Sequence, residues 1–67
     1  MESVYKVIEI IGTSEKGWAE AAQVAMERAS QSLRDLRVGE VVEQDVRYDE
    51  GTLYYRTKLR VSFKYQD

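Results

Sequence analysis

The sequence predicts an α+β fold in which a three-stranded, antiparallel-type sheet wraps around one helix, with the element order β-α-β-β. Three observations lead to this prediction. β-Branched residues dominate a first segment, apolar residues then recur at helical spacing, and two strand-like segments follow around a short turn. These segments are residues 4–11, 14–36, 37–48 and 52–65. A chain of 67 residues has room for one domain, which we expect to comprise residues 1–67.

The first predicted strand, residues 4–11, carries apolar side chains on both of its faces. Alternation places Ile8 and Ile10 on one face and Val7 and Ile11 on the other. A three-stranded sheet that packs on one helix buries only one of its faces. We therefore expect the second face of this strand to contact another copy of the chain.

Residues 14–36 are predicted to form one amphipathic helix, because their apolar side chains stack on one face of a 3.6-residue helix. Ser14 is the predicted N-cap, after a turn in which Gly12 adopts a backbone conformation closed to other residues. The apolar face is mostly alanine, so the sheet has to approach the helix closely. Its members are Trp18, Ala21, Ala22, Ala25, Met26, Ala29, Leu33 and Leu36.

The last two strands are predicted to form a long hairpin around residues 49–51. Residues 52–65 alternate between apolar and basic side chains, and charge sets the register against the preceding strand. Opposite charges on facing strands stabilise a sheet, and a slip by one residue would lose every such pair at once. The expected cross-strand pairs are Val42–Leu59, Val46–Tyr55, Glu43–Lys58 and Asp45–Arg56.

Composition excludes several classes of protein. The chain has no Cys and no His, which excludes disulfides, zinc sites and catalysis by a thiol or an imidazole. Its net charge of −2 predicts no nucleic-acid partner, and it has no apolar run that could span a membrane. The N-terminal stretch lacks the pattern of a signal peptide, so the default expectation is a cytoplasmic protein. The core of so short a chain is small, and we expect it to self-associate.

Glu43 and Asp45 are the best candidates for a calcium site, because carboxylates two residues apart on a strand share one face. Calcium takes about six to eight oxygen ligands, so a site also needs symmetry mates, backbone carbonyls or water. The alternative role for this pair is a set of salt bridges to Lys58 and Arg56. Glu9, on an apolar strand, is a third candidate ligand. Its alternative role is an ion pair with Arg or Lys across an interface.

Two other features allow a functional and a structural interpretation. Trp18 could stack on a ligand, or it could belong to the core or to an interface. A row of basic side chains on the last strand could hold a phosphate-bearing ligand, or it could be a solvated or salt-bridged face. The row comprises Arg56, Lys58, Arg60 and Lys64. No pair of carboxylates is marked for acid–base chemistry, and we do not expect an enzyme.

The opening Val4–Ser14 and the ending Leu59–Phe63 resemble those of the dodecins, as do Arg28-Ala29, Leu33-Arg34 with Leu36, and Glu40-Val41. The resemblance covers nearly the whole chain. It implies a β-α-β-β subunit that assembles as a hollow homododecamer. Most dodecins bind riboflavin or flavin mononucleotide (FMN) in stacked pairs, and they store or scavenge flavin without catalysing a reaction.

Two positions depart from the flavin-binding pattern. Val38 stands where a Trp stacks on the isoalloxazine ring, and Arg56 stands where a Gln hydrogen-bonds the flavin. The loss of a stacking ring removes about 1–3 kcal/mol, on the scale of bases stacked on aromatic side chains. The middle and last strands look more like the calcium dodecin branch. This resemblance implies a calcium-binding or storage assembly with impaired or absent flavin stacking. The alternatives are a flavin-storage dodecin and a ligand-free structural shell.

Overall fold

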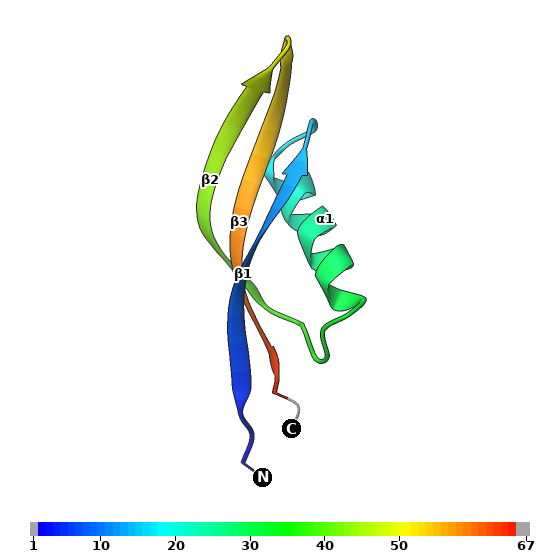
Figure 1. Ribbon diagram of the computed structural model, residues 1–67, viewed down its shortest axis with the longest axis vertical. Helices are drawn as coiled ribbons and strands as arrows, with labels where there is room; N and C mark the ends of the chain where they lie inside the picture. Colours follow the sequence, from blue (N-terminus) through cyan, green and yellow to red (C-terminus); the bar gives the residue numbers. More distant parts are fainter. Residues whose placement is uncertain (1, 66–67) are drawn as a thin grey trace.

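The computed structural model describes residues 2–65, which form a three-stranded antiparallel sheet and one helix (Figure 1). The elements are β1 (Tyr5–Ser14), α1 (Trp18–Ser30), β2 (Gly39–Asp49) and β3 (Thr52–Lys64). The strand order is β1-β3-β2, so the last strand of the chain lies at the centre and pairs antiparallel with both neighbours. The predicted β-α-β-β order and antiparallel sheet around one helix are therefore confirmed.

α1 packs on one face of the sheet, which we call the inner face; the opposite face is the outer face. On the inner face of β3, Thr57, Leu59 and Val61 are buried. The Thr57 hydroxyl is not left without a partner, because it donates a hydrogen bond to the backbone carbonyl of Trp18 at 2.8 Å. Hydrophobic burial on β3 and this hydrogen bond together hold the helix against the central strand.

The hairpin between β2 and β3 closes through Glu50 and Gly51, both with positive φ, at 49° and 83°. Positive φ at both central residues is the mark of a type I′ turn, whose twist matches that of the flanking strands. The turn is one residue shorter than predicted, because Asp49 still pairs with Thr52.

The register of the hairpin agrees with the prediction except at one place. The pairs Glu43–Lys58, Asp45–Arg56 and Val46–Tyr55 are confirmed, whereas Leu59 faces Val41 and not Val42. A β-bulge between Val41 and Glu43 adds one residue to β2 and changes which residues face outward. Before the bulge Glu40 shares the outer face, and after it Glu43 and Asp45 do, so the bulge places all three carboxylates on one face.

The helix is shorter at both ends than the predicted 14–36. β1 continues to Ser14, which pairs with Tyr55, and the N-cap is Gly17 with no side-chain cap. The prediction of Ser14 as N-cap is therefore wrong: its hydroxyl accepts the backbone N–H of Lys16 in the connecting loop. Beyond Ser30 the chain turns, and Leu36 packs against the core from outside the helix.

Gly12 lies inside β1 and is buried, so the predicted turn at this residue is also wrong. Its φ is not among the positive values of the chain, and its role is close approach. A Cβ at this position would lie 2.0 Å from the carbonyl oxygen of Ala21 and 2.9 Å from the Cβ of Ala25. The expected tight contact between the alanine face and the sheet occurs at this point.

The subunit is elongated, with extents of 51 × 20 × 17 Å, and the sheet extends beyond both ends of α1 (Figure 1). The buried apolar core is correspondingly small and consists of Ala21, Ala25, Leu59 and Val61. Large apolar side chains remain exposed on the outer face of β1 and along β2. They include Val7, Ile11, Val41, Val46 and Tyr48.

Candidate functional site

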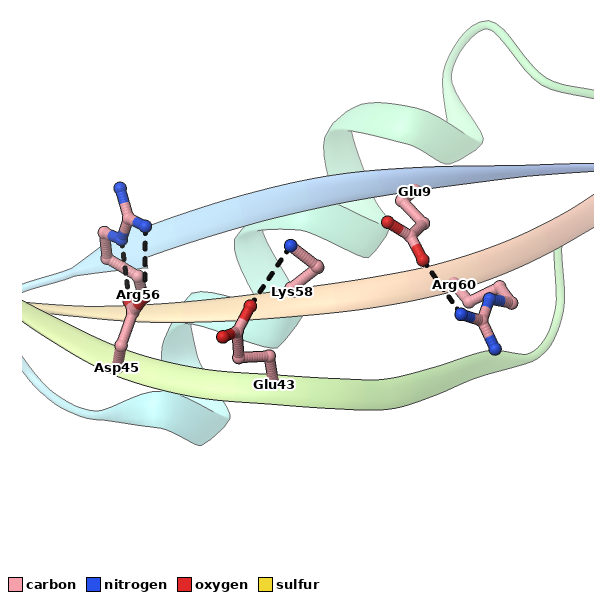
Figure 2. A network of polar contacts seen from close by, with 6 residues as sticks. All are labelled: Glu9, Glu43, Asp45, Arg56, Lys58 and Arg60. Atoms are coloured by element: carbon pink, nitrogen blue, oxygen red, sulfur yellow. Dashed lines mark hydrogen bonds and ion pairs between the residues drawn. The ribbon is translucent and has the colours of Figure 1, made fainter.

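The outer face of the sheet carries ion pairs that follow one another along β3 (Figure 2). The pair nearest the hairpin turn joins Asp45 to Arg56 through two hydrogen bonds, at 2.7 Å from Nε and 3.1 Å from Nη2. Lys58 contacts Glu43 at 3.1 Å. The salt bridges predicted as the alternative role of Glu43 and Asp45 are therefore present.

Arg60 contacts carboxylates from both neighbouring strands. Its Nη2 lies 3.0 Å from Glu9 on β1, and its Nη1 lies 3.6 Å from Glu40 on β2. Glu9 thus pairs with a cation of its own chain. Sequence reasoning did not identify Glu40, because strict alternation from Glu43 assigns it to the inner face. Only the bulge brings it outward, and nothing in the composition of Val41-Val42 marks that bulge.

Glu9, Glu43 and Asp45, the predicted metal ligands, all lie on the outer face but not in one cluster. Within residues 2–65, no three Asp or Glu side chains are close enough together to hold a metal ion. Each of the three carboxylates is bound instead to a cation from β3. A calcium site built from them needs oxygen atoms from a second subunit or from water, and the metal has to compete with these cations.

The bidentate contact with Arg56 holds the pKa of Asp45 below its usual value, chiefly through the hydrogen bond between the side chains. Desolvation opposes this effect, and the charges of Arg56 and Lys58 reinforce it. A carboxyl with a lowered folded-state pKa stabilises the fold above its unfolded pKa, and this contribution is lost as the pH falls through the folded value. Asp45 therefore makes stability dependent on pH in the acid range.

The free energy of unfolding of wild type should fall as the pH drops from about 5 through the ordinary Asp pKa of about 3.9, because Asp45 has a lowered pKa in the folded state. We expect Asp45→Asn to make this fall less steep. Chemical denaturation at a series of pH values measures this slope. Arg56→Gln should flatten it to the same extent, and the double variant should flatten it no further. A steeper slope in either single variant would contradict the assignment.

The two positions predicted to match flavin contacts, Val38 and Arg56, both lie on the outer face of the sheet. Val38 precedes β2 and is 70 % exposed. It borders a hollow of about 240 Å³ whose other lining residues are Val7, Glu40, Arg60, Val61 and Ser62. Arg56, the second position, is held by Asp45.

Trp18 lies at the start of α1 and belongs to the packing between the helix and the hairpin. Its indole N–H donates to the backbone carbonyl of Asp45 at 3.0 Å, and its ring meets the ring of Tyr55 edge to face with centroids 5.1 Å apart. The side chain is 38 % exposed, so it closes the edge of the core. These contacts match the structural interpretation of Trp18.

Comparison with known proteins assigns the chain to a family of small binding proteins. The dodecin family model matches residues 4–66, and the chain belongs to the dodecin family. Dodecins are non-enzymatic, and this membership confirms the expectation that the chain is not an enzyme. Calcium dodecin from Mycobacterium tuberculosis is 56 % identical over 63 residues, which cover 92 % of this chain and 89 % of that protein. Dodecin from Thermus thermophilus is 38 % identical over 68 residues, with 100 % and 99 % covered.

Solved structures agree with this assignment. The crystal structure of M. tuberculosis calcium dodecin, described as having a novel calcium-binding site, superposes with a TM-score of 0.90 at 54 % identity, covering 96 % of this chain and 93 % of that one. Dodecin from Streptomyces davaonensis gives a TM-score of 0.89 at 31 % identity, with both chains fully covered. In the part of the chain that the structure describes, no helix is long and apolar enough to cross a membrane.

Proposed function

We propose that residues 1–67 form one domain, the subunit of a non-enzymatic, calcium-binding homododecamer of the dodecin type. The observation that carries this proposal is the 56 % identity to a relative named calcium dodecin. The absence of an aromatic ring at Val38, together with the engagement of Arg56 by Asp45, supports calcium over flavin as the ligand.

Assembly is supported by the distribution of apolar surface. The buried core of the subunit is small, while Val7 and Ile11 on β1 and Val41 and Val46 on β2 remain exposed. Exposed apolar patches of this kind mark interaction sites, and a chain this short buries too little surface to be comfortably stable alone. Contact between copies would cover these strands, as the two-sided apolar pattern of β1 predicts.

The proposed calcium ligands are Glu43 and Asp45, with Glu9 as a further candidate. Glu43 is more than half exposed, so its carboxylate can reach a cation in solution. Exposed ion pairs such as Glu43–Lys58 contribute at most about 1 kcal/mol, and calcium held by several oxygens can displace the lysine. Because one subunit supplies too few oxygens, the site is completed by a second copy or by water.

Isothermal titration with calcium, on protein first stripped by a chelator, tests the proposal. We expect saturable binding by wild type, weakened about tenfold by Glu43→Gln and by Asp45→Asn, since loss of a charged ligand lowers affinity. Glu15→Gln, which neutralises an exposed carboxylate in the loop before α1, is the matched control and should bind like wild type. Absence of calcium binding by the wild type would overturn the proposal, and equal weakening in all three variants would overturn the site.

Two further measurements distinguish the alternatives. Riboflavin and FMN are expected to pass a size-cutoff filter that retains the protein, whereas retention at micromolar concentration would favour flavin storage. Sedimentation analysis is expected to give the mass of a dodecamer. A dodecamer that binds neither calcium nor flavin would indicate a ligand-free structural shell.

A further inference from the structure

The outer face of β3 holds the predicted row of basic side chains, and its members differ in their partners. Arg56, Lys58 and Arg60 each contact a carboxylate of a neighbouring strand, as the salt-bridged interpretation of this row predicted. Lys64, the last member of the row, forms no ion pair with any carboxylate of residues 2–65. Two of the salt-bridged cations, Arg56 and Lys58, contact the proposed calcium ligands themselves.

These two cations hold their carboxylates with unequal strength. Asp45 accepts two hydrogen bonds from Arg56, at 2.7 and 3.1 Å, and its side chain is 42 % exposed. Glu43 has a single contact with Lys58, at 3.1 Å, and its side chain is 57 % exposed. A bidentate guanidinium fixes both carboxylate oxygens, whereas an ammonium acts as a point charge on a flexible stem. Glu43 is therefore the carboxylate that a metal ion from solution engages more readily.

A cation that belongs to the sheet competes with calcium more strongly than a dissolved ion does. Strand pairing places Lys58 opposite Glu43 and Arg56 opposite Asp45, so each carboxylate always has a positive group within reach (Figure 2). Such tethering gives the group a high effective concentration, on the order of millimolar or above. Calcium therefore has to displace a cation of the protein before it can bind the carboxylate oxygens.

We propose that Lys58 and Arg56 set the calcium affinity of this site by competing with the metal for Glu43 and Asp45. The inference rests on the proposed function, because it takes calcium binding at these two carboxylates as given. Calcium displaces Lys58 from Glu43 first, and it has to break both hydrogen bonds of Arg56 to reach Asp45. The two basic residues neutralise the carboxylates when calcium is scarce, so the site fills only at higher calcium concentrations than bare carboxylates would need.

Calcium titration of the assembled protein, after a chelator has removed bound metal, tests the proposal. We expect Lys58→Gln to bind calcium about fivefold more tightly than wild type, on the scale of one exposed ion pair. Arg56→Gln should tighten binding at least as much, because the contact that it removes is bidentate. Lys64→Gln is the matched control, since it removes the same charge from the same face of β3 without breaking an ion pair of residues 2–65. It should change affinity less than twofold.

The outcomes separate this inference from the proposed function. If wild type binds calcium and neither Lys58→Gln nor Arg56→Gln binds it more tightly, competition is wrong and the proposed function stands. If only the two variants bind calcium, competition is supported, but calcium binding is not the function of the wild-type protein. If none of the three proteins binds calcium, both proposals fall.

A double-mutant cycle distinguishes direct competition from a general effect of charge. In the Glu43→Gln background Lys58 has no carboxylate to hold, so Lys58→Gln should no longer tighten calcium binding. Equal tightening with and without the Glu43 carboxylate would mean that the lysine acts only through the overall field, and the proposal would be overturned. Circular dichroism and gel filtration of each variant exclude loss of fold or assembly as the cause.

Discussion

Replacement of Gly12 by alanine is expected to destabilise the fold by about 1–3 kcal/mol, the usual cost of overpacking a tightly packed core. The new methyl group would lie 2.0 Å from the carbonyl oxygen of Ala21, a backbone atom near the start of α1. It would also lie 2.9 Å from the Cβ of Ala25. Neither of these two atoms can move away by rotation of a side chain. The helix has to move away from β1, and the buried contacts of the alanine face are lost with it.

Gly17→Ala is the matched control for this experiment. A Cβ at Gly17 would meet only Oε1 of Glu20, at 2.7 Å, which is the far end of a flexible side chain. The φ of Gly17 is 164°, an extended conformation open to any residue. Chemical denaturation at one fixed protein concentration should show a lower midpoint for Gly12→Ala and a nearly unchanged one for Gly17→Ala. Equal shifts for the two variants would contradict the close approach of helix and strand.

The long-range pairing of the hairpin could be predicted because charge marks it. Two acidic residues on β2 meet two basic residues on β3 in only one register, and that register is observed. The bulge could not be predicted, because Val41 and Val42 are the same residue type and either satisfies the apolar position opposite Leu59. Sequence patterns thus determined the pairs on the turn side of the bulge and failed at the bulge itself.

The ends of the helix were predicted poorly for a different reason. Ser14 is a favourable N-cap in isolation, but pairing of β1 with β3 continues through it and takes precedence over the local preference. At the other end, Leu33 and Leu36 keep the helical spacing after the helix has stopped. Both residues lie in the loop after the helix and are partly buried there. The hydrophobic periodicity therefore predicted which residues are buried, but not where the helix ends.

In the candidate site too, contacts that follow from regular alternation could be predicted, and those that depend on an irregularity could not. Pairing of Glu43 and Asp45 with β3 followed from the alternation of charges along two strands. Glu40 joins them only because of the bulge. No spacing in the sequence marks the position of that bulge.

Replacement of Leu59 by alanine is expected to have the largest effect of any single truncation, about 2–5 kcal/mol. Leu59 is 2 % exposed at the centre of β3 and packs in the cluster with Ala25 and Val61. The helix contributes Ala22, Ala25 and Met26 to this cluster, and the two alanines are too short to fill the space that Leu59 would leave. The cost therefore includes a cavity as well as the lost burial of the side chain.

Leu53→Ala provides the comparison, since Leu53 lies on the same face of the same strand but is 38 % exposed near the hairpin turn. The two variants remove the same atoms, so the difference between their unfolding free energies measures how much more deeply Leu59 is buried than Leu53. We expect Leu59→Ala to cost at least twice as much in denaturation experiments at matched concentration. Equal costs would mean that contact between subunits buries Leu53 as deeply as the helix buries Leu59, and the stability of the fold would then reside as much in the assembly as in the subunit.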